Sequence, residues 1–176
     1  MKRSQLEHII RAAGAITNQD ELIIIGSQAL LGQFPDAPEE LLHSIEADVF
    51  PKHRPDLSIQ IDGAIGELSP FHQTFGYYAH GVDESTARLP DGWKERLIAI
   101  HNENTRGVTG WCLEVHDLAI GKLAAGREKD LAFARNLLIH RLVNPQILWD
   151  RIQSLTSAAE LKGLVQDRLK AVQRPA

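Results

Sequence analysis

The sequence contains one cysteine, Cys112, among 176 residues. A single thiol forms neither an intrachain disulfide nor a multi-cysteine zinc site, so a disulfide framework is excluded and a reducing compartment is favoured. No stretch approaches the roughly 20 apolar residues of a membrane-spanning helix. Glu7, His8 and Arg11 interrupt the N-terminal segment before any apolar run of signal-peptide length. We therefore expect a cytoplasmic protein without a membrane partner.

The chain also lacks an excess of positive charge. Its 19 Lys and Arg residues against 23 Asp and Glu residues give a net charge of −4, so no diffuse positive field attracts nucleic acid or anionic membranes. The charge is uneven, because residues 1–140 hold 13 basic and 20 acidic side chains whereas residues 141–176 hold 6 and 3. A polyanionic partner would need a local basic patch, and the C-terminal segment is the most basic part of the chain.

The length and a hydrophobic fraction of 43% suffice for one core. We predict a domain over residues 1–140 and a C-terminal helical extension over residues 141–176 that packs on the same core. Apolar residues recur in the extension at the spacing of two helices: Leu148, Ile152, Leu155, Leu161, Leu164, Val165, Leu169 and Val172.

Periodicity divides the rest of the chain into helices and strands. An apolar stripe predicts an amphipathic helix over residues 4–16, with Ser4 as its cap. Residues 22–25 form an apolar run of Leu22 and three β-branched isoleucines that ends at Gly26, which is typical of a buried strand, and Ser27 is expected to cap a short helix through Leu31.

Residues 44–50 alternate between apolar and polar side chains, which predicts a second strand with Glu46 and Asp48 on one face. Further along, the patterns predict a helix over 56–68, short strands over 77–79, 86–89, 96–100 and 108–113, and helices from residue 116 onward. These elements indicate an α+β fold, a mixed β-sheet flanked by helices with a helical C-terminal third.

Gly26, Ser27, Glu46 and Asp48 form the combination that suggests chemistry. A glycine at the end of a buried strand lets backbone N–H groups approach an anion, and the following helix start favours phosphate. Carboxylates two residues apart on a strand project from one face, about 7 Å apart at their Cα atoms, and together can hold Mg²⁺. A phosphate cradle beside metal-binding carboxylates is what nucleotidyl transfer requires.

Three stretches, residues 23–30, 44–49 and 116–131, resemble the nucleotidyltransferase-fold proteins. The similarity is greatest to a bacterial branch related to the toxin components of abortive-infection toxin–antitoxin systems, and it covers roughly residues 20–140. The third stretch is the most distinctive. It contains the segments His116-Asp117-Leu118, Lys122-Leu123 and Gly126-Arg127-Glu128-Lys129-Asp130-Leu131.

The resemblance implies a role for each matching residue: Gly26 and Ser27 hold phosphates, Glu46 and Asp48 bind metal and catalyse, Lys122 and Asp130 complete the catalytic site, and Lys122 and Arg127 contact the nucleotide. It implies a Mg²⁺-dependent enzyme that moves a nucleoside monophosphate from a nucleoside triphosphate to a protein or RNA hydroxyl, with an antitoxin-like partner. The alternative is a degenerate module that binds a nucleotide or a partner protein without turnover.

Position 46 carries Glu where the family more often has Asp, and Glu46 follows Ser27 by 19 positions, more than is usual in the family. If Glu46 and Asp48 lie within reach of one metal ion and open onto a cleft with Gly26, the enzyme hypothesis stands; if the insertion at residues 32–43 fills that cleft, the enzyme hypothesis fails. Glu103 and Glu114 are both candidates for a third metal carboxylate, and spacing does not choose between them. Glu114 could instead be the N-terminal acid of a helix.

Several residues have structural interpretations. Arg127 and Asp130 are three residues apart and can pair along a helix without any substrate. The aromatic residues of segment 71–78 can stack on a base, but more often such residues fill a core. His72 and His80 have no histidine partner at the spacing of a helical zinc motif, so a zinc site is not expected. Cys112 ends an apolar run and is expected to point into the core.

Overall fold

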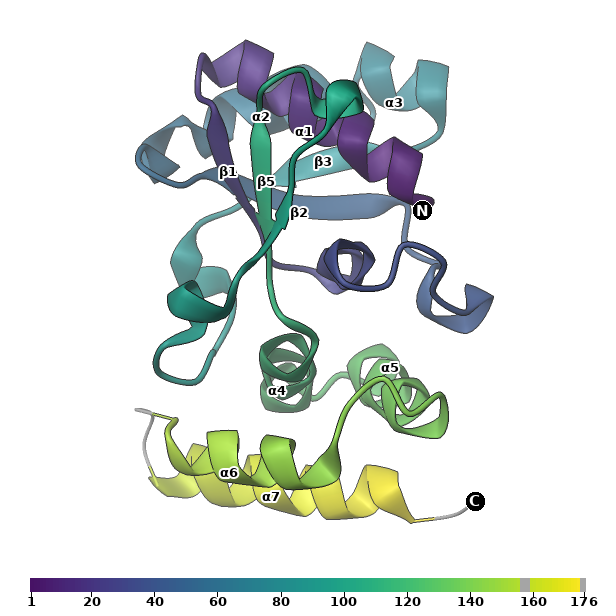
Figure 1. The fold of residues 1–176 in the computed structure, drawn as a ribbon, viewed down its shortest axis with the longest axis vertical. Helices are drawn as coiled ribbons and strands as arrows, with labels where there is room; N and C mark the ends of the chain where they lie inside the picture. Colours follow the sequence, from purple (N-terminus) through teal and green to yellow (C-terminus); the bar gives the residue numbers. More distant parts are fainter. Residues whose placement is uncertain (156–158, 175–176) are drawn as a thin grey trace.

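A computed structural model describes residues 1–155 and 159–174 of the chain (Figure 1). It confirms the α+β class, with a five-stranded mixed sheet in the order β3-β2-β1-β5-β4. The strands are β1 (Glu21–Ile24), β2 (Glu46–Pro51), β3 (Tyr78–Gly81), β4 (Ile98–Ile100) and β5 (Thr109–Cys112). The central strand β1 runs antiparallel to β2 and parallel to β5, and β2 runs parallel to β3.

The helices gather at two sides of this sheet (Figure 1). The helices α1 (Arg3–Thr17), α2 (Ser58–Ile65) and α3 (Pro70–Phe75) lie in the upper part of the view, near the sheet. Below the sheet lie α4 (Val115–Ala125), α5 (Glu128–Ile139), α6 (Pro145–Gln153) and α7 (Ala159–Gln173). The C-terminal third of the described chain is therefore helical, as predicted.

The first helix shows why these residues adopt this structure. Leu6, Ile9, Ile10 and Ala13 are completely buried, so the predicted apolar stripe faces the core. The helix begins at Arg3, however, and Lys2 occupies the cap position. The prediction that Ser4 caps this helix is therefore wrong, because Ser4 already lies inside the first turn.

The helices α6 and α7 pack against α4 and α5 through the predicted apolar positions. Seven of them are buried or partly buried: Leu148, Ile152, Leu155, Leu161, Val165, Leu169 and Val172. Leu164 is the exception, with 46% of its surface exposed. Its position falls outside the stripe that α7 turns to its neighbours, so the prediction that it packs inward is wrong.

The helix α7 also contacts the end of α4 through a polar interaction. Arg168 donates hydrogen bonds to the carbonyl oxygens of Leu123 (2.7 Å) and Ala124 (2.9 Å). Its guanidinium packs on Gly126, which ends α4 in the left-handed conformation with φ +69°. Arg168 therefore satisfies carbonyl groups that the last turn of a helix leaves without partners.

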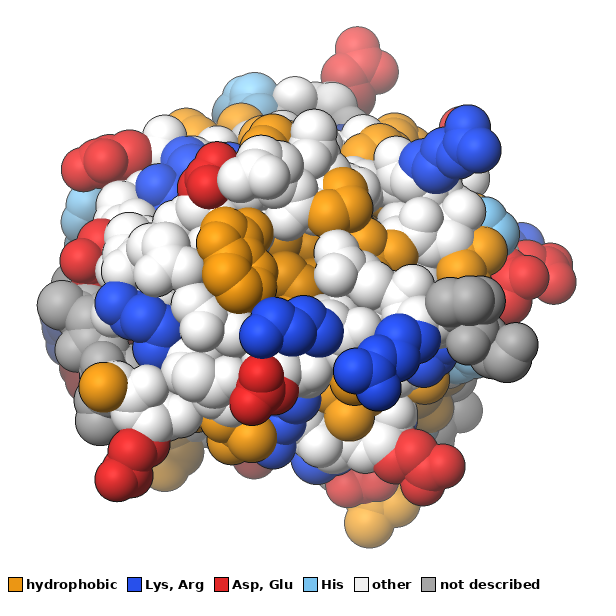
Figure 2. All heavy atoms as spheres, turned by 90° about the horizontal axis from the view of Figure 1, so that it is seen from below, with side chains coloured by type: hydrophobic (Ala, Val, Ile, Leu, Met, Phe, Trp, Pro, Cys, Tyr) orange, Lys and Arg blue, Asp and Glu red, His pale blue; other side chains and the backbone are white. Residues whose placement is uncertain are grey.

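Figure 2 shows the molecule from below, the side on which α6 and α7 lie. Lys and Arg side chains surround a small apolar patch on this face. Trp149 of α6 contributes to the surface beneath Lys170, whose Nζ lies 5.7 Å from the centre of the indole ring. Within the described residues no helix is both long and apolar enough to span a bilayer.

One predicted strand does not form. Thr86 ends a single 3-10 turn, Glu84–Thr86, at whose start the Asp83 side chain accepts a hydrogen bond from the Ser85 backbone, and residues 87–89 form no strand. The chain then passes over α4, where Leu89 packs close to Gly121. The apolar residues of this segment are therefore covered by a helix, and none of them pairs with a strand.

Candidate active site

The turn after β1 forms the floor of the candidate site. The backbone N–H of Ile25 donates to the carbonyl oxygen of Asp48 at 3.1 Å, which extends the pairing of β1 with β2 to this point. A Cβ atom on the next residue, Gly26, would lie 2.1 Å from Oδ2 of Asp48. Gly26 has a φ of −59°, which any residue can adopt. Glycine is needed here because the Asp48 carboxylate occupies the space that a Cβ atom would take.

Ser27 begins the six-residue 3-10 helix Ser27–Gly32, and Gly26 occupies its cap position. The predicted role of Ser27 as a cap is therefore wrong, because the helix starts one residue earlier than a Ser27 cap requires. The Ser27 side chain instead lines the cleft described below.

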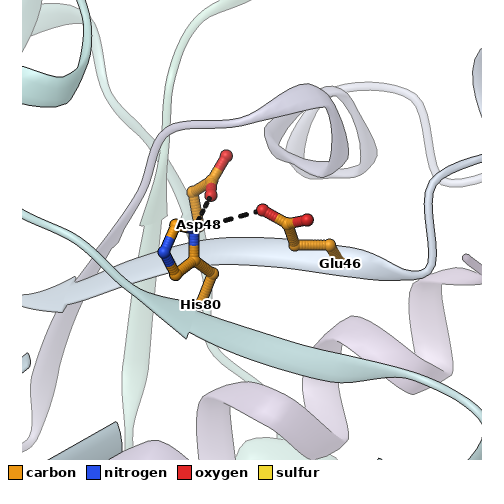
Figure 3. Close-up of side chains that lie close together, drawn as sticks. All are labelled: Glu46, Asp48 and His80. Carbon is orange, nitrogen blue, oxygen red and sulfur yellow. Dashed lines mark hydrogen bonds and ion pairs between the residues drawn. The ribbon is translucent and has the colours of Figure 1, made fainter. Parts of the chain in front are cut away.

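Glu46 and Asp48 project from the same face of β2, as predicted, and β3 adds a third group (Figure 3). The strand register places Asp48 opposite His80 and Glu46 opposite Tyr78. Nδ1 of His80 lies 3.2 Å from Oε1 of Glu46 and 3.2 Å from Oδ1 of Asp48. The Tyr78 hydroxyl donates to the other oxygen of Glu46 at 2.9 Å. One ligand atom from each of Glu46, Asp48 and His80 lies within 4.8 Å of the others.

The electrostatics of this group favour a bound cation. Burial, together with the neighbouring charge of Glu46, raises the pKa of Asp48 to about 6. Burial would also raise the pKa of Glu46, but hydrogen bonds from Tyr78 and His80 and the charge of His80 leave it below its usual value. In the described part of the chain, no Lys or Arg forms an ion pair with either carboxylate. A divalent ion would relieve the repulsion between them, so the residues present fit a metal site.

The opposite wall of the site comes from α4 and α5. Asp130 is 1% exposed and contacts two cations, Lys122 (3.2 Å) and Arg127 (2.6 Å). The predicted pairing of Arg127 with Asp130 along the helix is therefore present, and Lys122 joins it from the neighbouring helix. The Arg127 side chain is still 61% exposed. Asp130 thus fixes two positive side chains at the edge of the cleft.

A cavity of about 720 Å³ lies between these walls. Ser27, Glu46, Asp48 and His80 line it on the sheet side; Lys122, Arg127, Lys129, Asp130, Phe133 and Asn136 line it on the helix side. A second cavity of about 150 Å³ includes Gly26 and shares Asp48, Lys122, Arg127 and Asp130 with the first. The insertion contributes Glu40, Leu41 and His43 to the wall of the larger cavity. It borders the cleft and does not fill it.

His80 has no histidine at the spacing of a zinc motif, and the sequence did not reveal that it lies beside Glu46 and Asp48. It lies 32 positions after Asp48, and only the pairing of β2 with β3 brings the two together. A signal was present, because Tyr78 and His80 show the same two-residue spacing on a strand as Glu46 and Asp48.

The two candidates for a third carboxylate lie outside the cleft. Glu114 caps α4 by accepting a hydrogen bond from the His116 backbone, and it also pairs with Arg151. It therefore has the structural role of a helix N-terminal acid. Glu103 belongs to a short 3-10 turn before β5 and does not line either cavity.

Cys112 and three aromatic residues of segment 71–78 (Phe71, Phe75 and Tyr77) are likewise structural, whereas Tyr78 of that segment donates its hydroxyl hydrogen bond to Glu46 at the site. Cys112 is completely buried, and burial raises the pKa of its thiol to about 12, so it is not a nucleophile. Phe71, Phe75 and Tyr77 pack against the ring of His8 and one another, at centroid distances of 4.7 to 6.0 Å. They line none of the three cavities that border Glu46 or Asp48.

Comparison with protein families identifies the chain over nearly its whole length. Residues 4–170 match a family described as nucleotidyltransferase of unknown function (DUF6036). No curated protein and no solved structure matches the chain. The chain belongs to this nucleotidyltransferase family.

Proposed function

We propose that this member of a nucleotidyltransferase family transfers a nucleoside monophosphate from a nucleoside triphosphate to a hydroxyl group of a protein or an RNA, with cleavage of the bond between the α- and β-phosphates and release of pyrophosphate. In this proposal Glu46 and Asp48 hold the divalent metal, with Mg²⁺ as the ion expected from the sequence. Lys122 and Arg127 contact the triphosphate. The toxin-related role and an antitoxin-like partner belong to the same proposal.

One observation carries the proposal. Two neighbouring carboxylates with no Lys or Arg partner in the described chain face two cations, Lys122 and Arg127, across a single cavity. This arrangement suits a ligand that brings both a divalent cation and several negative charges, as a metal–triphosphate complex does. The cavity volume of about 720 Å³ lies within the range of small-molecule sites.

The proposed role of each residue that surrounds the two cavities follows from its position. Gly26 lets phosphate oxygens approach the backbone beside Asp48. Lys122 and Arg127 offset the negative charge that develops on the phosphates during transfer, which is the main source of catalysis in phosphoryl chemistry. Asp130 is a positioning residue, because it holds both cations from a buried position. A divalent ion, when bound, neutralises phosphate oxygens and favours deprotonation of the acceptor hydroxyl.

The test is incubation of the protein with each α-labelled nucleoside triphosphate and Mg²⁺, in the presence and absence of cellular RNA and protein. Asp48→Asn keeps the shape of the side chain and removes its charge, so we expect near-complete loss of label transfer. Its melting temperature at pH 8 should equal or exceed that of the wild type, because a buried charge beside Glu46 has been removed.

Asp167→Asn is the matched control, since it makes the same chemical change at a position of α7 that is 77% exposed. It should transfer label at the wild-type rate. Unchanged transfer by Asp48→Asn would contradict the metal role, and nucleotide binding without transfer by the wild type would favour the binding module. Growth arrest on expression of the wild type, and none with Asp48→Asn, is the result expected of a toxin.

A further inference from the structure

We infer that His80 is a third metal ligand and that its imidazole makes the site select Mn²⁺ over Mg²⁺. The inference rests on the proposed function, which places a divalent ion at Glu46 and Asp48. It adds that the ion is Mn²⁺ and that the imidazole of His80 selects this ion.

The position of His80 matches that of a ligand. In an octahedral site with ligands at about 2.1 Å from the ion, adjacent ligand atoms lie about 3 Å apart. Nδ1 of His80 lies 3.2 Å from one oxygen of Glu46 and 3.2 Å from one oxygen of Asp48. A single ion can therefore contact all three groups after small side-chain shifts. Figure 3 shows the three side chains pointing toward one another from two neighbouring strands.

The surrounding structure holds these atoms in place. The parallel pairing of β2 and β3 sets Asp48 and His80 directly opposite each other, so the backbone fixes the positions of their Cα atoms relative to one another. Tyr78 donates to the Oε2 atom of Glu46, while the Oε1 atom is the one beside His80. Such outer contacts orient metal ligands and typically change metal affinity by about 10- to 100-fold when removed.

The chemistry of the ligand set distinguishes the two ions. Mg²⁺ prefers oxygen ligands and keeps several waters, and it gains little from an imidazole nitrogen. Mn²⁺ accepts carboxylate oxygen, water and phosphate oxygen, and as a first-row transition ion it also binds nitrogen. The set contains two carboxylates, one imidazole and no thiolate, because Cys112 is completely buried in the core. Oxygen thus dominates the set, which favours Mn²⁺ among the transition ions.

The direct test is pulsed electron paramagnetic resonance of Mn²⁺ bound to the full chain at millimolar concentration, without nucleotide. A coordinated imidazole produces an echo modulation from its ¹⁴N nucleus. We expect this modulation in the wild type and in His43→Asn, a control histidine that lines the same cavity but does not belong to the three-residue group. It should be absent in His80→Asn.

A second variant tests selectivity. His80→Asp replaces the nitrogen with a carboxylate, and calorimetric titration with Mn²⁺ and with Mg²⁺ gives the ratio of their affinities. We expect this ratio to fall at least tenfold relative to the wild type. Circular dichroism and thermal melting verify that each variant is folded, so that a loss of binding is not mistaken for unfolding.

The outcomes separate the inference from the proposed function. Mn²⁺ binding that Asp48→Asn abolishes, but that shows no ¹⁴N modulation in the wild type, would refute the role of His80 and leave the carboxylate site intact. An unchanged affinity ratio in His80→Asp would refute the selectivity. Absence of any metal binding that depends on Asp48 would refute both the inference and the metal role in the proposed function.

Discussion

Replacement of Gly26 with alanine should disable the site without unfolding the protein. The new Cβ atom would lie 2.1 Å from Oδ2 of Asp48, whereas an ordinary contact is at least 3.4 Å. The carboxylate oxygen must therefore move by about 1.3 Å. The backbone at position 26, with φ −59° and ψ −170°, is accessible to alanine, so the effect should act through Asp48 and not through backbone strain.

The expected loss follows from that displacement. A misplacement of about 1 Å at a reacting centre costs roughly 100-fold in rate, so Gly26→Ala should lower label transfer by about two orders of magnitude. Overpacking should lower the free energy of unfolding by about 1 to 3 kcal/mol. The assays are label transfer with each nucleoside triphosphate, Mn²⁺ binding by calorimetry, and thermal melting on the same preparation.

Gly63→Ala is the matched control. Gly63 lies inside α2, and a Cβ atom there meets nothing within 4 Å. Alanine should raise the stability by about 0.5 to 1 kcal/mol, because it favours the helix, and should leave transfer unchanged. A folded Gly26→Ala protein with wild-type transfer and wild-type Mn²⁺ affinity would show that the position of Asp48 is unimportant, and the reasoning would fail.

Two further predictions concern ligand binding and pH. Mg²⁺ should raise the melting temperature only together with a nucleoside triphosphate, by about 5 to 10 °C at ligand concentrations about 100-fold above Kd, because the nucleotide supplies the missing ligands; an equal shift with nucleotide alone would favour the binding module. Burial would raise the pKa of Glu114, but His116 and Arg151 lower it to about 2. The ionised carboxylate of Glu114 therefore stabilises the fold above pH 4.5, and this contribution is lost as the pH falls toward 2. The stability advantage of the wild type over Glu114→Gln, measured by urea unfolding, should therefore shrink by about 3 kcal/mol between pH 6 and pH 2; a difference independent of pH would contradict this role.

Local patterns predicted much of the fold. The apolar run before Gly26 and the alternation around Glu46 and Asp48 are short-range signals, and both strands begin and end within two residues of their predicted bounds. Residues 86–89 show the limit of such signals, because a β-prone run becomes a strand only if another strand lies beside it. Here α4 covers the segment instead, and nothing within four residues encodes that contact.

The candidate site divides in the same way. The two carboxylates share one strand, so their common face follows from the two-residue period. His80 reaches them only through a strand pairing across 32 residues, and Lys122 shares their cavity only because α4 packs below the sheet. Long-range partners of this kind depend on tertiary packing, which a single sequence does not display.

The contact between Arg168 and the end of α4 links the far C-terminal helix to the cleft. Arg127 follows directly after Gly126, the residue on which the Arg168 guanidinium rests. The turn at Gly126, which precedes Arg127, is thus contacted from outside the site by α7, none of whose residues lines either of the two cavities. If Arg127 contacts the triphosphate as proposed, a substitution in α7 that displaces Arg168 should change nucleotide affinity without changing any residue that lines the two cavities.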